Sequence, residues 1–161
     1  MASTILSAML GAKTHAVAGS TKLKATTAGH IYNIEAAADI DNGAIVGKGE
    51  FLRPEVYKEA AASNTFAGKI IGQAANGNWY VEVTACAAGD CLVLTVPLIY
   101  ETYVTENQDE ANFYNAKGDI LRCYELYVGD VFELSAVGFT GTPEAGKAVS
   151  VASKKLKVAT A

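Results

Sequence analysis

Residues that commonly carry catalysis are scarce in this chain of 161 residues. It has only two histidines, His15 and His30, so a Ser-His-Asp or Cys-His arrangement would have to use one of them. The Gly-x-Ser-x-Gly elbow of α/β-hydrolases does not occur. We interpret His30 as a strand-start residue whose ring is hydrogen-bonded to a neighbour or to water. The sequence therefore predicts no catalytic residues, and we expect a protein that is not an enzyme.

Cysteine is also scarce and odd in number: Cys86, Cys91 and Cys123. An odd count without a signal peptide indicates a reducing compartment, so we expect synthesis in the cytoplasm. A structural zinc site needs four ligands in close pairs, and the three thiols do not provide that pattern. Cys86 and Cys91 could pair across a hairpin under oxidation, but free cysteine is among the most buried residue types. We predict core packing, with neither metal nor cofactor.

The chain has no surplus of basic residues and no long hydrophobic run. Its net charge is −4 and its pI is about 5.2, and no basic stripe is visible, which argues against a nucleic-acid partner. The apolar start of the chain is broken by Gly11 and Lys13 before it could span a membrane. The densest basic group, formed by Lys154, Lys155 and Lys157, predicts a strand edge protected by lysines.

One acidic turn imitates the start of a calcium-binding loop. Residues 39–43 (DIDNG) supply Asp39 and Asp41, and Glu50 stands at the twelfth position counted from Asp39. Position five is Gly43, which has no side-chain oxygen, and position six is Ala44, where such a loop requires glycine. The residues that follow read as a strand. We therefore predict a plain turn.

Two further patterns imitate functional sites. Gly141 and Gly146-Lys147 have the spacing of a phosphate-binding loop, but Ala148 lacks the hydroxyl that holds magnesium, and a strand rather than a helix is expected to follow. Several carboxylates could in principle form a glycosidase pair, although a solvated helix face explains them more simply. They are Glu101, Glu106, Asp109 and Glu110.

Hydrophobic patterning predicts a mainly β fold: a single-domain β-barrel or β-sandwich with one or two short helices. In residues 79–84 the side chains of Trp79, Val81 and Val83 share one face, which indicates a half-buried strand. Residues 91–96 are almost all apolar and predict a strand buried on both faces. Residues 30–34, 69–71 and 147–158 read as further strands. Asn42-Gly43 is a turn signal.

The stretch from residue 118 to residue 141 predicts a β-hairpin that turns on Gly129-Asp130. Thr105 and Gln108 have capping-box spacing and predict a short helix over about residues 106–115. Residues 53–60 could form one or two helical turns after Pro54, or an extended loop. For domain organisation we predict an N-terminal arm or weak edge strands over residues 1–29 and a β domain over residues 30–161.

Tyrosine is over-represented, with eight residues against one Trp and five Phe. Tyrosine is enriched at protein interfaces because it offers apolar area with a polar end, but it is also a good strand residue. The sequence leaves these two readings open. Five of the tyrosines crowd one region: Tyr100, Tyr103, Tyr114, Tyr124 and Tyr127.

Three phrases resemble a family of small tailed-phage structural proteins that coat or cement the capsid. They are DNGAIVGKGE (41–50), PLIYETYVTENQDEANFYNAKGDILRCYELYVGDVFELS (97–135) and FTGTPEAGKAVSV (139–151). The family pattern has an Asn-Gly turn before a short strand, a helical segment ending in Phe-Tyr-Asn, an Arg-x-Tyr-x-Leu-x-x-Gly-Asp run and a Gly-Lys turn. The matching residues here are Phe113-Tyr114-Asn115, residues 122–130 and residues 141–147.

The resemblance implies a non-enzymatic capsid decoration protein that binds the outer surface of a phage capsid and stabilises the packed head. Binding only the assembled shell shifts the equilibrium toward it, and many copies multiply a modest contact. The implied partners are the major capsid protein and further copies of this chain on the shell, and the implied location is the virion surface. A tail or baseplate subunit is the alternative, and a small β-barrel ligand-binding domain is a weaker one.

Overall fold

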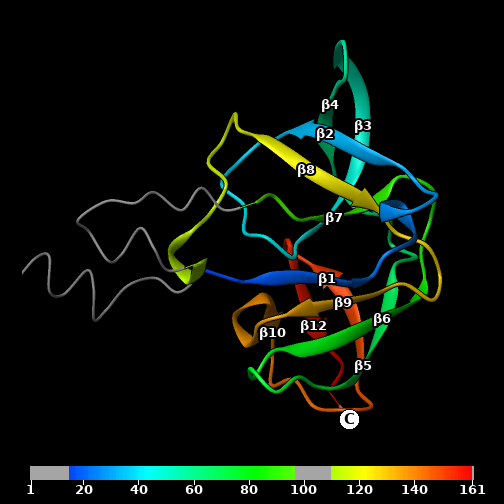
Figure 1. Cartoon of the computed structure of the whole chain (residues 1–161), viewed down its shortest axis with the longest axis vertical. Coiled ribbons are helices and arrows are strands. Elements are labelled where there is room, and N and C mark those ends of the chain that lie inside the picture. The colour runs from blue at the N-terminus through cyan, green and yellow to red at the C-terminus, as the bar shows by residue number, and fades with distance from the viewer. Residues whose placement is uncertain (1–14, 97–109, 161) are drawn as a thin grey trace, which may run out of the picture.

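A computed structural model of the chain describes residues 15–96 and 110–160 (Figure 1). The helical elements of this part are the single 3-10 turns η1 (Lys24–Thr26), η3 (Glu110–Asn112) and η4 (Ala136–Gly138). The strands are β1 (Ala18–Lys22), β2 (Ile31–Glu35), β3 (Ile45–Arg53), β4 (Val56–Ala60), β5 (Ala67–Gln73), β6 (Trp79–Ala85), β7 (Asp90–Val93), β8 (Ile120–Glu125), β9 (Val131–Leu134), β10 (Phe139–Thr140), β11 (Ala148–Ala152) and β12 (Lys155–Val158).

The strands form a closed barrel and an open sheet. The barrel has the order β2-β4-β3-β7-β8, and the seven-stranded sheet has the order β1-β9-β6-β5-β11-β12-β10. Figure 1 shows the barrel strands in the upper half of the molecule and the sheet strands in the lower half. Most pairs are antiparallel, but β2 pairs with β4, and β10 with β12, in parallel. The mainly β fold with a barrel and short helices is confirmed.

The barrel and the sheet each have a hydrophobic core, and strands β3 and β7 contribute to both. Ile45 of β3 is paired with Leu92 of β7, and both side chains pack in the core of the sheet. Their neighbours Val46 and Cys91, also paired, pack in the core of the barrel. Successive side chains of a strand point to opposite faces, so a strand between two cores must be apolar on both. The prediction of a doubly buried strand is confirmed for Cys91–Val93, while residues 94–96 lie beyond the end of β7.

The alternation predicted for β6 is also observed. Val81 and Val83 are fully buried in the sheet core, Trp79 packs against that core, and Thr84 on the other face is exposed. This strand lies between β5 and β9, with one face on the core and the other turned outward. A period of two in the sequence was therefore sufficient to assign its faces.

The hairpin predicted over residues 118–141 is wrong, although its turn exists. Gly129 has a φ of 93°, and the Asp130 carboxylate accepts hydrogen bonds from the backbone N–H groups of Tyr127 at 2.9 Å and Lys24 at 3.2 Å. However, β8 pairs with β2 and β7 in the barrel, whereas β9 pairs with β1 and β6 in the sheet. The turn therefore carries the chain from the barrel to the sheet.

Another crossing between the sheet and the barrel, at residues 86–89, separates two of the cysteines. It joins β6 of the sheet to β7 of the barrel, so Cys86 and Cys91 do not face each other across a hairpin. Cys86 Sγ lies 3.3 Å from the carbonyl oxygen of Leu126, and Cys91 Sγ lies 3.3 Å from that of Gly89. In the described part of the chain all three thiols are free, Cys91 and Cys123 being buried and Cys86 half-buried.

Residues 53–60 are neither helical turns nor a loop. They complete a β3–β4 hairpin in which Glu55 has a φ of 64°, and β4 then pairs with β2. The left-handed conformation beside Pro54 reverses the chain at once, leaving no room for a helix. Of the predicted helix over residues 106–115, Glu110–Asn112 form the 3-10 turn η3, and residues 106–109 lie outside the described residues.

The C-terminal lysines do not lie on an edge strand, contrary to the prediction. Strand β12 lies between β11 and β10, and Lys155 and Lys157 alternate with buried Leu156 and Val158. At the other end of the sheet, β1 is an edge strand. The division of the chain at residue 29 stays a prediction.

Candidate interaction surface

A row of aromatic rings crosses the outer end of the barrel, and we name it the aromatic row: His30, Tyr32, Tyr57 and Phe51. The ring centroids of His30 and Tyr32 are 5.8 Å apart and stacked. Tyr32 meets Tyr57 edge-on at 5.7 Å, and Tyr57 meets Phe51 edge-on at 6.0 Å. Stacked and edge-on arrangements at these distances are the favourable geometries of aromatic pairs. The four rings therefore form a continuous, ordered row, in which half-buried Tyr32 and Tyr57 also pack against the barrel core and Phe51 is exposed.

Strand pairing brings these rings together from distant parts of the chain. The parallel register of β2 and β4 places Ile34 opposite Tyr57, and the antiparallel register of β3 and β4 places Phe51 opposite Tyr57. The ammonium group of Lys48 lies 4.4 Å from the centre of the Tyr32 ring and 4.7 Å from that of Tyr57. A cation over aromatic faces is attracted by their negative π-clouds. Lys48 thus ties the two tyrosines to each other.

Glu125 fixes the other end of the aromatic row. One of its carboxylate oxygens lies 3.0 Å from His30 Nδ1 and accepts hydrogen bonds from the hydroxyls of Tyr127 at 3.0 Å and Tyr32 at 3.4 Å. The other oxygen accepts one from the backbone N–H of Gly89 at 3.3 Å. The Glu125 side chain is only 12% exposed. A nearly buried carboxylate with this many donors acts as a structural anchor.

The titration of these groups reflects the same anchoring. Burial raises the pKa of Glu125, but hydrogen bonds from Tyr127, His30 and the Gly89 amide outweigh it, so the pKa is lowered overall. Burial, together with the charge of Glu125, raises the pKa of Tyr32 to about 12. The Tyr32 hydroxyl therefore stays protonated at neutral pH and donates a hydrogen bond to the Glu125 carboxylate.

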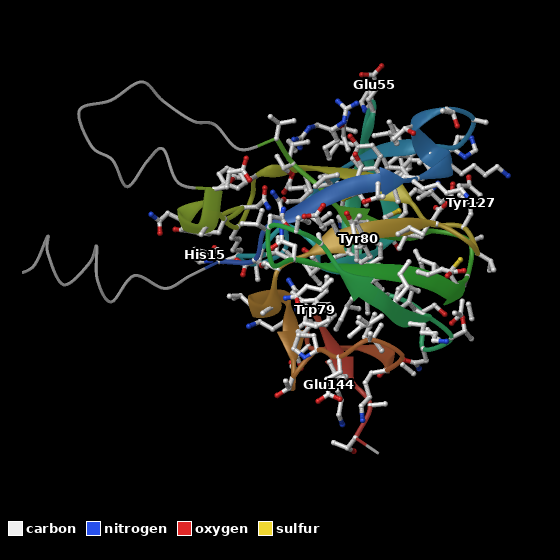
Figure 2. All side chains as sticks on the ribbon, turned by 60° about the horizontal axis from the view of Figure 1, so that its bottom comes forward. His15, Glu55, Trp79, Tyr80, Tyr127 and Glu144 are labelled. Carbon is white, nitrogen blue, oxygen red and sulfur yellow. The ribbon has the colours of Figure 1, made fainter. Side chains whose placement is uncertain are left out.

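The outer end of the row lies on a projecting hairpin. Figure 1 shows β3 and β4 extending beyond the rest of the barrel, and Figure 2 places Glu55 at the tip. Phe51 on this hairpin is 63% exposed. An ion pair between Arg53 Nη1 and Glu35 Oε2, at 3.0 Å, joins the hairpin to β2. Exposed aromatic and arginine side chains on a rigid support are typical of protein-binding surfaces.

The tyrosines singled out in the sequence do not form one surface. Tyr114 stacks on His15 with ring centroids 4.8 Å apart, Tyr124 accepts a hydrogen bond from Arg122 Nε at 3.1 Å, and Tyr127 binds Glu125. Figure 2 shows His15 and Tyr127 on opposite sides of the molecule. Tyr100 and Tyr103 lie outside the described residues.

The aromatic row itself was missed by the sequence analysis. Tyr32, Phe51 and Tyr57 stand in three strands, and a parallel pair such as β2–β4 leaves no local signal in the chain. The available hint was the repeated placement of an aromatic residue on a strand that also carries apolar residues. That hint is equally typical of an ordinary core.

The acidic turn at residues 39–43 joins separate segments of the backbone. Asp41 lies 2.7 Å from His15 Nδ1 and accepts the Ala16 N–H at 3.1 Å, while Asp39 accepts the Lys117 N–H at 2.9 Å. Glu50 is an exposed residue of β3. Within the described residues, no group of three or more His, Cys, Asp or Glu side chains is placed to hold a metal ion.

Two asparagines complete this polar network. The side-chain amide of Asn42 donates to the Thr95 carbonyl at 2.8 Å and accepts from the Thr95 N–H at 3.0 Å. Buried Asn115 donates to the Ile40 carbonyl at 3.1 Å. The predicted turn at Asn42-Gly43 is confirmed, since Gly43 has a φ of 87°.

Residues 141–147, which imitate a phosphate-binding loop, lead into strand β11, as expected.

The thiols are poorly suited to nucleophilic chemistry. Burial, with the nearby Glu125 and Asp90 charges, raises the pKa of Cys91 to about 12. Burial also raises the pKa of Cys123 well above its ordinary value, and that of half-buried Cys86 as well. The reactive form of cysteine is the thiolate, and these three side chains hold their protons at neutral pH.

Comparisons with protein-family models, with curated proteins and with solved structures found no match for this chain. Within residues 15–96 and 110–160, no helix has the length and apolar character that crossing a membrane requires. The function must therefore be argued from the chain's own residues and from the surfaces that they form.

Proposed function

We propose that this chain is a non-enzymatic virion structural protein that binds the outer surface of a phage capsid and stabilises the packed head. The resemblance of residues 41–50, 97–135 and 139–151 to capsid-coating proteins supports the class. The partners in this proposal are the major capsid protein and neighbouring copies of the chain, and the location is the capsid surface.

The structural observation that carries the proposal is the aromatic row on the projecting hairpin. Its rings are held by Glu125, Lys48 and each other, so little side-chain freedom is lost when a partner covers them. Exposed Phe51 at its end offers an apolar anchor of the kind that dominates interface energies. On a shell, each such contact is repeated over many copies, so a modest affinity suffices.

The location can be tested on intact virions with gold-labelled antibody against this chain. Label over the heads is the expected result. Label confined to the tail or baseplate would favour the alternative structural role, and virions without label would contradict both. The antibody should first be shown to recognise the purified native protein, so that a lack of label is informative.

The contact can be tested with heads purified from the phage that encodes the chain and depleted of it. Phe51→Ser should lower the amount of protein that sediments with these heads by about tenfold, the effect of losing one well-packed aromatic anchor. Ile71→Ser is the matched control, because Ile71 is 45% exposed on β5, away from the hairpin. Equal binding by Phe51→Ser and wild type would remove the hairpin from the contact.

A further inference from the structure

Strand β1 is an edge of the seven-stranded sheet, and no described residue pairs with its outer side. Among the described residues, β1 pairs only with β9. Ser135 N–H donates to the Val17 carbonyl, and residues 18, 19 and 20 continue the same register opposite 134, 133 and 132. Antiparallel pairs alternate between bonded and non-bonded positions, so the backbone N–H and C=O groups of Ala18 and Ser20 point away from β9. Within residues 15–96 and 110–160 no strand pairs with these groups, so they can accept another strand.

A groove of about 240 Å³ lies along this edge. Ala18 and Ser20 form one side, and the other side comes from the chain beyond β7, from η3 and from β8. The lining residues that matter here are Leu94, Val96, Glu110 and Tyr124. Val96 is 72% exposed, so the groove offers apolar surface as well as hydrogen-bonding groups. Among the described residues that line it, Glu110 carries the charge.

Residues 1–14 have the chemistry that fits this groove. Their sequence, MASTILSAMLGAKT, contains five large apolar residues, no side-chain carboxylate and one basic side chain, Lys13, which complements Glu110. In an extended strand, Leu6 and Leu10 would share one face with Ala8 between them. The segment is long enough to reach a neighbouring molecule, since an extended chain of this length spans about 45 Å.

The described chain begins at the same groove. Ala16 is one of the lining residues, and the backbone N–H groups of His15 and Ala16 are held by the Ala111 carbonyl at 2.6 Å and the Asp41 carboxylate at 3.1 Å. In each copy, residues 1–14 therefore join the described chain beside the same groove that borders the outer edge of β1. A donor and an acceptor on every copy allow an exchange that repeats from molecule to molecule.

We propose that residues 1–14 of a second copy pair with the free edge of β1 and bury their leucines in this groove. The contact is β-augmentation, in which main-chain hydrogen bonds give affinity and side-chain pockets give specificity. It links copies of this chain to one another and does not rest on the capsid role, because it can be measured with the purified protein alone.

Ser20→Pro tests the strand edge directly. Proline removes the outward N–H of residue 20 and leaves the β1–β9 hydrogen bonds in place, so the association constant from analytical ultracentrifugation should fall by about tenfold or more. Ser20→Ala is the matched control: it removes the same hydroxyl but keeps the N–H, and should associate like wild type. Circular dichroism and thermal unfolding must show that Ser20→Pro is folded.

Leu6→Asp tests the donor segment and should give the same loss without touching the folded part of the chain. The proposal is overturned by a wild type that stays monomeric at every concentration, or by Ser20→Pro and Leu6→Asp variants that associate like wild type. A crosslinking experiment tells whether residues 1–14 bind β1 of another copy or β1 of their own copy. It uses the double variant Ser7→Cys, Ser20→Cys and a short bis-maleimide that joins the two thiols. Linked dimers on a gel are expected, whereas linkage within one monomer would show that each copy covers its own groove and would overturn the exchange.

Discussion

The barrel and the sheet solve the problem of strand edges in opposite ways. The barrel closes on itself in the order β2-β4-β3-β7-β8, so each of its strands has a partner on both sides. The sheet ends at β1 on one side and at the two-residue strand β10 on the other. Apart from the projecting part of the β3–β4 hairpin, where β3 has left β7 and pairs with β4 alone, the barrel meets a partner through its side chains, whereas the sheet can also offer its backbone.

This difference assigns the two proposed contacts to different parts of the molecule. The aromatic row belongs to the closed barrel and is made of side chains held in place by Glu125 and Lys48. The groove beside β1 borders the open sheet and offers backbone groups that no described strand pairs with. A protein that binds a shell and also its own neighbours needs two such surfaces that can be occupied together.

The largest effect is expected where the two parts meet, in strand β7. Leu92→Ala removes a fully buried side chain from the sheet core and should lower the free energy of unfolding by about 3 kcal/mol. Because Leu92 stands on a strand shared with the barrel core, both parts should unfold together. Urea unfolding can follow Trp79 fluorescence, which reports on the sheet, and far-ultraviolet circular dichroism, which reports on the whole chain.

Val96→Ala is the control for this substitution, because Val96 is 72% exposed and its truncation should change stability by less than about 0.5 kcal/mol. Coincident transitions from the two probes are expected in wild type and in both variants. A fluorescence transition that precedes the dichroism transition would show instead that the sheet unfolds without the barrel, and the shared strands would not couple them.

Turn chemistry in the sequence identified where the chain reverses but not which strands meet. The Gly129-Asp130 pair indicated a turn, and Gly129 does have a positive φ. The strands on either side of it, β8 and β9, nevertheless belong to different parts of the fold. A turn signal specifies a few dihedral angles, whereas pairing depends on burial of distant residues. Strand faces were easier to assign, as Val81 and Val83 show, because alternation is local.

The aromatic row was unreadable for the same reason. Tyr32 and Tyr57 come together only because β2 and β4 pair in parallel across the intervening strand β3 in the sequence. The crowding of tyrosines between residues 100 and 127 was a better local signal, but its described members, such as Tyr114 and Tyr127, make separate contacts. Proximity along the chain was a poor guide to proximity on the surface.

A smaller effect is expected from the anchor of the aromatic row in the barrel. Glu125→Gln removes the charge from a carboxylate that accepts several hydrogen bonds, and should lower the free energy of unfolding at pH 7 by about 2 kcal/mol. The pKa of Glu125 is lower in the folded chain than in the unfolded one, so this stabilisation is present above the unfolded pKa, about 4.3. It is lost as the pH falls through the folded pKa.

Urea unfolding at several pH values should therefore show the gap between wild type and Glu125→Gln closing in acid. Glu133→Gln provides the comparison in the sheet, where the carboxylate accepts hydrogen bonds from the neutral side chains of Asn76 and Asn78 at 2.7 and 2.9 Å. Its loss should be about 1 kcal/mol or less, because within the described residues this carboxylate has two hydrogen-bond donors and one of the two bonds is exposed to solvent. A larger loss at Glu133 than at Glu125 would contradict the anchoring role of Glu125.

The smallest effect is expected from the ion pair that joins the two parts. Lys154, in the turn between β11 and β12, places Nζ 2.9 Å from Glu59 Oε1 on β4. The Glu59 side chain is only 6% exposed, whereas that of Lys154 is 38% exposed. The other carboxylate oxygen of Glu59 accepts a hydrogen bond from the Ala37 N–H at 2.8 Å, which the loss of Lys154 leaves in place. Lys154→Met should therefore cost about 1 kcal/mol, less than the loss of a fully buried pair, and the cost should shrink in high salt.

Lys155→Met is the matched control, since Lys155 is the exposed neighbour of Lys154, and it should leave the urea midpoint within error of wild type. Replacing Glu59 as well, in Glu59→Gln with Lys154→Met, should restore part of the loss, because no carboxylate then remains buried without its cation. If Lys154→Met and Lys155→Met proved equally stable at low salt, the ion pair would contribute nothing to holding the sheet against the barrel. The shared strands β3 and β7 would then be sufficient for that connection.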